Sequence, residues 1–241
     1  MLSRTITTAF FVLLTSQAIP QDVIYKESEV PAYTLPAPLR FENGTPVTTP
    51  ADWGKRREEL LQLFASHVYG KTPVGRPPAM RFESRKKVSG FLDGKATLEE
   101  IRIHFSAADD GPFLDLLLVK PTEIPASGVP TFLTLNFGGN QTLHASPEIT
   151  LSRSWMRSSA EDVKNGLVVD NRATEKSRGS AVSRWPLEKL IDSGTALASF
   201  YYGDIDPDFD DGFENGIHAL FGKPAADEWG SIGAWAWGAS R

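Results

Sequence analysis

The stretch TFLTLNFGGN, Thr131 to Asn140, decides the fold that this sequence predicts. Its mostly apolar first part predicts a core strand at 131–137, and the Gly-Gly-Asn turn ends that strand. A short helix with one apolar side is predicted at 185–193, and a second core strand follows at 195–202. Strand, helix and strand in this order form a βαβ unit, so the two strands should be parallel.

Upstream of this unit, three further runs predict strands at 80–88, 97–105 and 113–119. The second run alternates apolar and polar residues, whereas the third is almost continuously apolar. Asp93-Gly94 and the turn at 109–111 separate the runs. The chain is therefore predicted to be of the α/β class, with an antiparallel meander at the edge of a larger sheet that the βαβ unit continues.

A longer helix is predicted at 50–69. Thr49 can serve as its N-cap, Pro50 occupies its first position, and Gly70 provides a C-terminal stop. One apolar stripe recurs along it at helical spacing, formed by Trp53, Leu60, Phe64 and Val68.

The first residues have the n-region, apolar run and small-residue cleavage pattern of a secretory signal peptide, which we assign to 1–18. The alternative is a short membrane anchor, but the run is shorter than the ~20 residues that a spanning helix needs. We therefore expect an exported protein, periplasmic or extracellular, with no membrane segment after cleavage. Residues 19–48 are rich in Pro, Thr and Glu and predict an extended arm on the domain surface.

Composition narrows the function. The net charge is -5, with acids and bases interspersed, which is unlike the basic stripe of nucleic-acid-binding proteins. The chain has no cysteine, which excludes disulfides, a thiolate metal site and a cysteine nucleophile. No pair of histidines has metal-ligand spacing on one element, and we expect neither a metal nor a cofactor. Of the four histidines, His144 and His218 are the two that could enter a cleft.

Gly138, Gly139 and Asn140 are the candidate site residues. A glycine turn after a core strand allows the backbone to approach a substrate closely, and in some hydrolases such a turn supplies an N–H group to an oxyanion hole. The alternative is a plain turn that ends the strand.

The acidic segment at 204–211 suggests calcium, but its spacing fails. Asp211 occupies the position where an EF-hand loop requires glycine, and Ile217 occupies that of its glutamate. A solvated acidic loop at the carboxyl end of a strand is the favoured interpretation, and such loops line clefts in α/β sheets.

The segment at 235–241 contains Gly-Ala-Ser, which resembles the start of a G-x-S-x-G nucleophile elbow. Such an elbow needs a strand before the serine and a helix after it, whereas the residues before Ser240 fit a helix. Its apolar face is predicted to contain Trp229, Ile232, Ala236 and Ala239. Tryptophans here are expected in the core rather than in a sugar-binding platform.

Five separate segments together resemble glucuronoyl esterases of carbohydrate esterase family 15, bacterial type, from about residue 30 to the last residue. They are the helix Trp53–Gly70, Leu135–Asn140, Ser183–Pro186, Tyr201–Asp208 and Trp235–Gly238. The resemblance implies an α/β-hydrolase-type three-layer sandwich. It also implies a serine carboxylic ester hydrolase that cleaves esters between glucuronic acid side chains of xylan and lignin alcohols, with a Ser-His-Asp/Glu triad and no metal.

The family's nucleophile lies in a G-x-S-R-x-G elbow, a couple of dozen residues beyond the Trp-Ala-Trp-Gly helix. The resemblance therefore implies that residues 49–241 form an incomplete domain that ends before the elbow, and no catalytic residue is carried over. The chain alone is expected to be inactive. Two alternatives stay open: an acetyl xylan-type polysaccharide esterase of the same fold, and a non-catalytic carbohydrate-binding protein. The sequence does not fix the oligomeric state.

Overall fold

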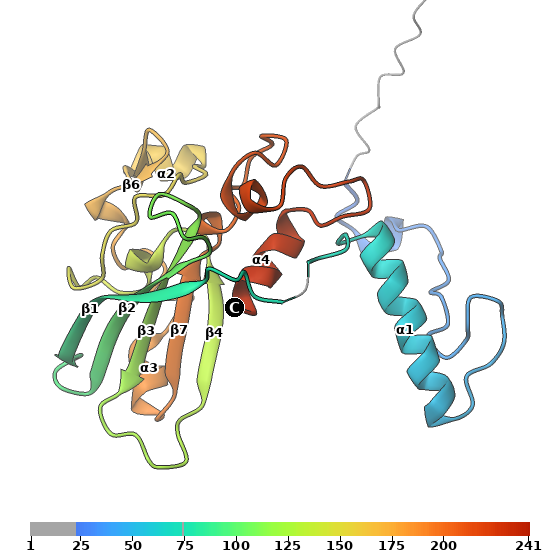
Figure 1. Cartoon of the computed structure of the whole chain (residues 1–241), viewed down its shortest axis with the longest axis horizontal. Helices are drawn as coiled ribbons and strands as arrows, with labels where there is room; N and C mark the ends of the chain where they lie inside the picture. Colours follow the sequence, from blue (N-terminus) through green and yellow to red (C-terminus); the bar gives the residue numbers. More distant parts are fainter. Residues whose placement is uncertain (1–22, 74) are drawn as a thin grey trace, which may run out of the picture.

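A computed structural model describes residues 23–73 and 75–241, and the predicted signal peptide lies outside these residues. Its main sheet has five strands in the order β1-β2-β3-β7-β4 (Figure 1). The strands are β1 (Arg81–Phe91), β2 (Ala96–His104), β3 (Phe113–Pro121), β4 (Thr131–Asn136) and β7 (Ala196–Tyr201). The helices are α1 (Pro50–His67), α2 (Ala160–Asn165), α3 (Leu187–Asp192) and α4 (Ser231–Ala239).

The pairing confirms the predicted meander and βαβ unit. The strands β1, β2 and β3 pair antiparallel, and β3 pairs antiparallel with β7. The strand β4 pairs parallel with β7 from Thr131↔Ala196 to Asn136↔Tyr201. The carboxyl ends of β4 and β7 therefore meet at the same edge of the sheet, which is where α/β sheets hold their ligands.

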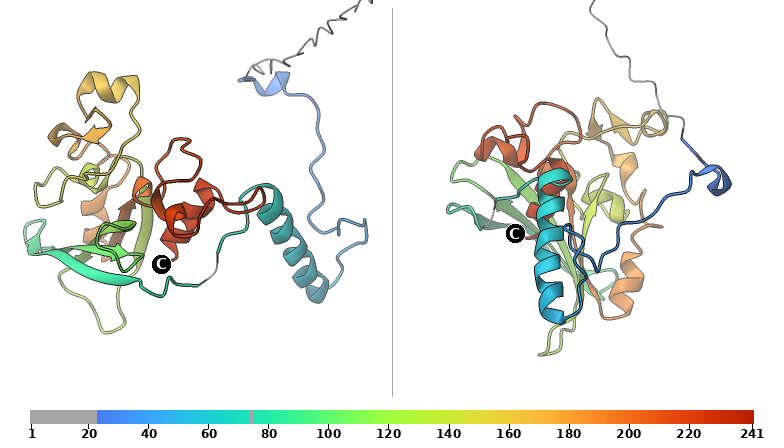
Figure 2. Two further views of the ribbon diagram at one scale, coloured as in Figure 1. Left: turned by 45° about the horizontal axis from the view of Figure 1, so that its top comes forward. Right: turned by 90° about the vertical axis from the view of Figure 1, so that its right-hand side faces the viewer.

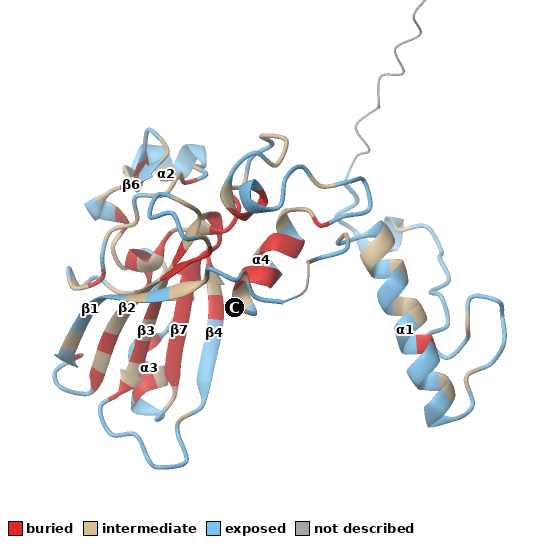
Figure 3. Cartoon of the chain, viewed as in Figure 1, coloured by how far each residue is buried: buried red, intermediate tan, exposed pale blue. Residues whose placement is uncertain are grey.

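Two cores cover the two faces of this sheet, and together they give three layers. Alternate side chains of a strand point to opposite faces, so Leu197 packs with Leu187 and Ile191 of α3, whereas Phe200 packs with Trp237 of α4. All six residues of β7 are buried, and Figure 3 shows the buried residues concentrated in β2, β3 and β7.

Helix α1 forms as predicted, and its capping box is complete. The Thr49 side chain accepts from Asp52 N, and the Asp52 carboxylate accepts from Thr49 N. Gly70 then turns the chain with φ +78°, and a Cβ there would lie 2.1 Å from Glu228 O. Position 70 therefore requires glycine, because any side chain there would collide with the backbone of Glu228.

The apolar stripe of α1 is not buried. Helix α1 stands apart from the sheet in Figure 1 and in the left view of Figure 2, and Phe64 and Val68 are 48% and 60% exposed. The arm lies against α1 rather than on the sheet, since Arg56 Nε donates to Pro38 O at 3.3 Å and Glu42 N donates to Glu59. Periodicity specifies an apolar face, but not which surface covers it.

The stretch between β4 and α3 is more regular than its polar composition suggests. It contains α2, with a capping box from Ser159 and Asp162, and a small hairpin of β5 (Val168–Val169) and β6 (Arg172–Ala173). No helix within 23–73 and 75–241 combines the length and hydrophobicity needed to cross a membrane.

The two edges of the sheet differ in charge. Strand β1 is protected by Arg85, Lys86 and Lys87, whereas β4 exposes Phe132 and Leu133 at 60% and 51% and has β7 as its one strand partner among the described residues. Exposed apolar edge strands promote pairing between molecules.

We therefore expect Phe132→Lys to reduce concentration-dependent self-association, because a lysine on the β4 edge opposes edge-to-edge pairing. Sedimentation velocity between 5 and about 100 μM would measure it, with Ile124→Lys, another exposed apolar position outside the sheet, as the matched control. Equal association in both variants would contradict this role of the edge.

Candidate active-site loop

The turn after β4 is held by its own neighbours. Asn136 is buried, and its Oδ1 accepts from Gly139 N at 2.7 Å. Its Nδ2 donates to Asn140 Oδ1 at 2.7 Å and to Ser199 Oγ of β7 at 3.0 Å. One amide side chain therefore connects the turn to both parallel strands.

The two carbonyl groups of the turn also have partners. Gln141 Nε2 donates to Gly138 O at 2.7 Å, and Thr142 Oγ1 donates to Gly139 O at 2.8 Å. Gly139 has φ +91°, and a Cβ there would lie 2.5 Å from Gln141 Oε1, so the position requires glycine. These contacts fix the orientation of the 138–139 and 139–140 peptide groups.

The orientation divides the three candidate residues. Gly139 is buried and its N–H is bound to Asn136, so it faces inward. Gly138 and Asn140 are half-buried, and they remain the candidates for donating an N–H to a substrate oxygen. Sequence reasoning grouped the three residues, and it missed Asn136 because a polar residue at a strand end is common.

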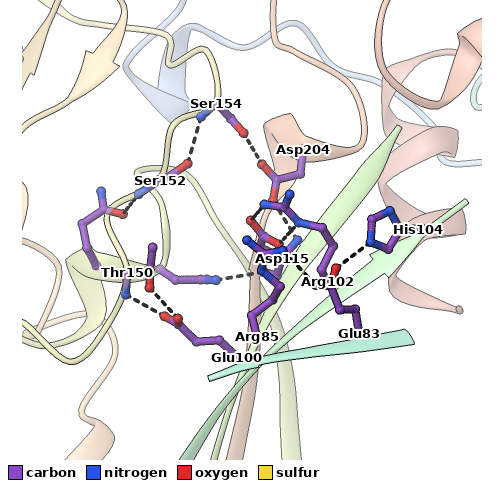
Figure 4. Close-up of polar contacts among 12 residues, drawn as sticks. Glu83, Arg85, Glu100, Arg102, His104, Asp115, Thr150, Ser152, Ser154 and Asp204 are labelled. Carbon is purple, nitrogen blue, oxygen red and sulfur yellow. Dashed lines mark hydrogen bonds and ion pairs between the residues drawn. The ribbon is translucent and has the colours of Figure 1, made fainter. Parts of the chain in front are cut away.

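Beside this turn, an ion-pair network crosses the sheet (Figure 4). Arg102 on β2 donates two hydrogen bonds to Asp115 on β3, at 2.8 and 2.7 Å. Asp115 N donates to Asp204 Oδ2 at 3.1 Å, and Asn140 Nδ2 donates to Asp115 O at 2.9 Å. The network therefore joins the Gly138–Asn140 turn to the turn that follows β7.

Asp204 lines a cavity of about 220 Å³ whose lining also includes Arg102, Asn140 and Tyr201. Ser154 Oγ donates to Asp204 Oδ1 at 2.6 Å. Burial raises the pKa of Asp204 to about 7, because desolvation penalises its charged form more than these hydrogen bonds stabilise it. Of this network, the sequence analysis singled out Asn140 and the segment that begins at Asp204, but it missed Asp115, whose signal is a lone aspartate in the apolar 113–119 run.

The acidic loop is only partly solvated. Asp208 accepts from Arg157 Nη1 at 2.8 Å and from Tyr202 Oη at 3.1 Å, and both acid and arginine line an open cleft at this edge. Asp206, by contrast, is buried, and desolvation raises its pKa to about 6. The prediction of a solvated loop is therefore wrong for Asp206.

His144 and His218, the two histidines that the sequence analysis considered for a cleft, do not face the Gly138–Asn140 turn. His218 is fully buried, with ring centroids 4.8 Å from those of Phe213 and Trp229, and burial lowers its pKa. His144 packs against Phe91 and accepts a hydrogen bond from Ser146 N at 3.1 Å.

Ser240 is the C-cap of α4, and its hydroxyl donates to Trp237 O at 2.7 Å. The helical interpretation of this segment is therefore confirmed, and Trp229 is buried as predicted, but the predicted face is wrong for Ile232 and Ala236. Ile232 is 59% exposed, and the buried positions are Gly233, Ala234, Trp237 and Gly238. A Cβ on Gly238 would lie 2.6 Å from Ile205 Cγ1, so the helix packs through its glycines.

Comparison with known proteins places this architecture. No protein-family model matches the chain. A carbohydrate esterase from an unknown prokaryotic organism is 41% identical over 229 residues, which is 92% of this chain and 51% of that protein. A solved CE15 esterase from a marine bacterial metagenome is 42% identical, with a TM-score of 0.75 over 90% of this chain and 54% of that one. The chain is homologous to the carbohydrate esterases of family 15.

The glucuronoyl esterase of Solibacter usitatus gives the same result, with 42% identity and a TM-score of 0.77 over 89% of this chain and 54% of that one. The family 15 resemblance and the α/β-hydrolase fold are thus confirmed, and the homologues are carboxylic ester hydrolases. The chain spans about half the length of the curated carbohydrate esterase and of these two solved esterases.

We expect Asn136→Ala to destabilise the chain by about 2–4 kcal/mol, because it removes three hydrogen bonds, two of them buried. Ser199→Ala removes one of them and should cost about 1 kcal/mol. Urea unfolding followed by circular dichroism would measure both. An Asn136→Ala cost no larger than that of Ser199→Ala would show that Asn136 does not hold the turn.

A pH dependence follows from Asp204. Its folded pKa of about 7 exceeds the ordinary aspartate pKa of 3.8, so the folded chain binds this proton more tightly than the unfolded chain does. The contribution of protonated Asp204 to the stability of the folded chain is complete below about pH 4 and is lost as the pH rises to about 7. The melting temperature of the wild type should therefore fall relative to that of Asp204→Asn between pH 4.5 and 7.5. Asp210→Asn, at an exposed position, is the control and should follow the wild type. If the melting temperatures of the wild type and of Asp204→Asn change equally with pH over this range, the expected role of Asp204 is contradicted.

Proposed function

We propose that this chain is part of an exported serine-type carboxylic ester hydrolase that cleaves glucuronate esters linking xylan and lignin in plant cell-wall material. The homology to glucuronoyl esterases at 42% identity carries the proposal. The placement of a rigid glycine turn at the carboxyl edge of the sheet supports it. Export rests on the signal-peptide pattern at 1–18.

In the reaction we propose, a serine attacks the ester carbonyl, a histidine accepts its proton, and the tetrahedral intermediate carries a negative oxygen. A donor about 2.7–3.1 Å from that oxygen stabilises it. In this reaction the chain supplies the donor, which is the N–H group of Gly138 or of Asn140. The hydrogen bonds of Asn136 and Gln141 hold the turn in one geometry, so no reorganisation is needed when charge develops.

The nucleophile, its base and its acid are proposed to belong to sequence beyond Arg241. Ser240 is a poor nucleophile because its hydroxyl is bound within α4. The carbohydrate-binding alternative is weakened, because Trp229 and Trp237 are each only 2% exposed and cannot form a sugar platform.

We expect no turnover of a benzyl glucuronate ester by residues 19–241, and turnover by a protein extended through the downstream Gly-x-Ser-Arg elbow, acid and histidine. Removal of a triad typically lowers kcat by about 10⁶-fold, so the contrast should be large. Acetylated xylan is the parallel substrate for the acetyl esterase alternative.

Ser240→Ala in the extended protein is the matched control, and its kcat should equal that of the unsubstituted protein. Turnover by residues 19–241 that disappears in Ser240→Ala would overturn the proposal and make Ser240 the nucleophile. Faster turnover of acetyl than of glucuronate esters by the extended protein would assign the acetyl esterase alternative.

A further inference from the structure

Another cavity, of about 250 Å³, includes Gly138 in its lining, whereas the lining of the Asp204 cavity includes Asn140. Its apolar walls come from the stretch between β4 and α3 and include Met156, Leu167, Val168 and Ala181. Phe137, Gly138 and Trp185 also line it. The polar and charged part of the lining is Thr142, Arg157, Asp162, Ser177, Ser180 and Arg184. A cavity of roughly 150 Å³ with apolar walls already admits benzene, so this one can hold a single aromatic ring with a small substituent.

Arg184 distinguishes this cavity from the others. Among the described residues no carboxylate lies within ion-pair distance of its guanidinium, whereas Arg102 and Arg157 have acidic partners. The guanidinium instead lies 5.6 Å from the ring centroid of Phe137 and 5.9 Å from that of Trp185. Cation–π contact at these distances orients the arginine without neutralising it.

The other charged groups at the cavity are already used. Asp162 faces it, but its carboxylate accepts from Ser159 N and Ser159 Oγ, at 2.9 and 2.6 Å, in the cap of α2. Arg157 is paired with Asp208 at 2.8 Å. Among the described residues that line the cavity, Arg184 is therefore the one cation without an ion-pair partner, and Asp162 keeps its negative charge while it caps α2.

The loop that carries Arg184 is fixed in place. Gly179 N donates to Gln141 O at 3.0 Å, and Ala181 N donates to Thr142 O at 2.9 Å. Since Gln141 and Thr142 also hold the Gly138–Asn140 turn, the turn and the arginine loop form one hydrogen-bonded unit. The site is formed before any ligand arrives, which lowers the entropic cost of binding.

We propose that this cavity binds a small aryl carboxylate, with the ring against Met156, Leu167 and Ala181 and the carboxylate on the Arg184 guanidinium. A planar guanidinium can bind a carboxylate through two parallel hydrogen bonds. The apolar walls select for a ring over a sugar or an inorganic anion. The inference stands on the cavity alone and does not depend on the proposed esterase activity.

Titration of the ¹⁵N-labelled chain with sodium benzoate at constant ionic strength tests the proposal. A ligand of this size should bind with a Kd on the order of 1 mM. The backbone amide signals of Gly138, Ala181 and Trp185 should shift. Benzyl alcohol, which keeps the ring without the charge, and acetate, which keeps the charge without the ring, should each bind at least about tenfold more weakly.

Arg184→Gln should weaken benzoate binding at least about tenfold, and Arg184→Lys should weaken it less. Arg153→Gln, an exposed arginine outside the cavity, is the matched control and should bind as the unsubstituted chain does. If Arg184→Gln fails to fold, the three-ligand comparison on the unsubstituted chain decides. Benzoate binding that is equalled by benzyl alcohol or by acetate, or that persists in folded Arg184→Gln, would overturn the proposal.

Discussion

The burial of β7 is the constraint on which the rest of the structure depends. All six residues from Ala196 to Tyr201 are buried, between β3 on one side and β4 on the other. Because its side chains alternate, Leu197 anchors the α3 core and Phe200 the α4 core. Parallel pairing with β4 then brings the Gly138 turn and the Asp204 turn to one edge. The position of the candidate site is thus a consequence of how this single strand is covered.

The polar groups at that edge are satisfied by a small number of side chains. Asn136 connects the turn to Ser199, and Asp115 connects Arg102 to Asp204 and Asn140. Buried polar groups are costly unless they are hydrogen-bonded, so such a network specifies one geometry for the turn. Asp204 differs from the other groups of this network, since its raised pKa makes its ionisation costly near neutral pH even though it is hydrogen-bonded.

Much of this architecture could be predicted because burial leaves a strong pattern. The apolar runs that became β4 and β7, and the alternation in β2, indicated the sheet and its parallel pair. Two other predictions failed for physical reasons. The stripe of α1 is apolar but stays exposed, and α4 buries Gly233 and Gly238 rather than Ile232. Periodicity identifies buried positions from apolar side chains alone. It therefore misses a glycine that is buried because another side chain approaches it closely, as Ile205 approaches Gly238.

The candidate site could be predicted only as a location. Gly138, Gly139 and Asn140 were identified as a turn after a core strand, but the roles of the three differ because Asn136 binds one N–H of the turn. Residue-resolved hydrogen exchange by NMR tests this central claim most directly. The Gly139 amide should exchange at least about a hundredfold more slowly than the Gly138 and Asn140 amides. Equal exchange rates at the three amides would contradict the account, because the turn would then not be held in the orientation that frees Gly138 and Asn140.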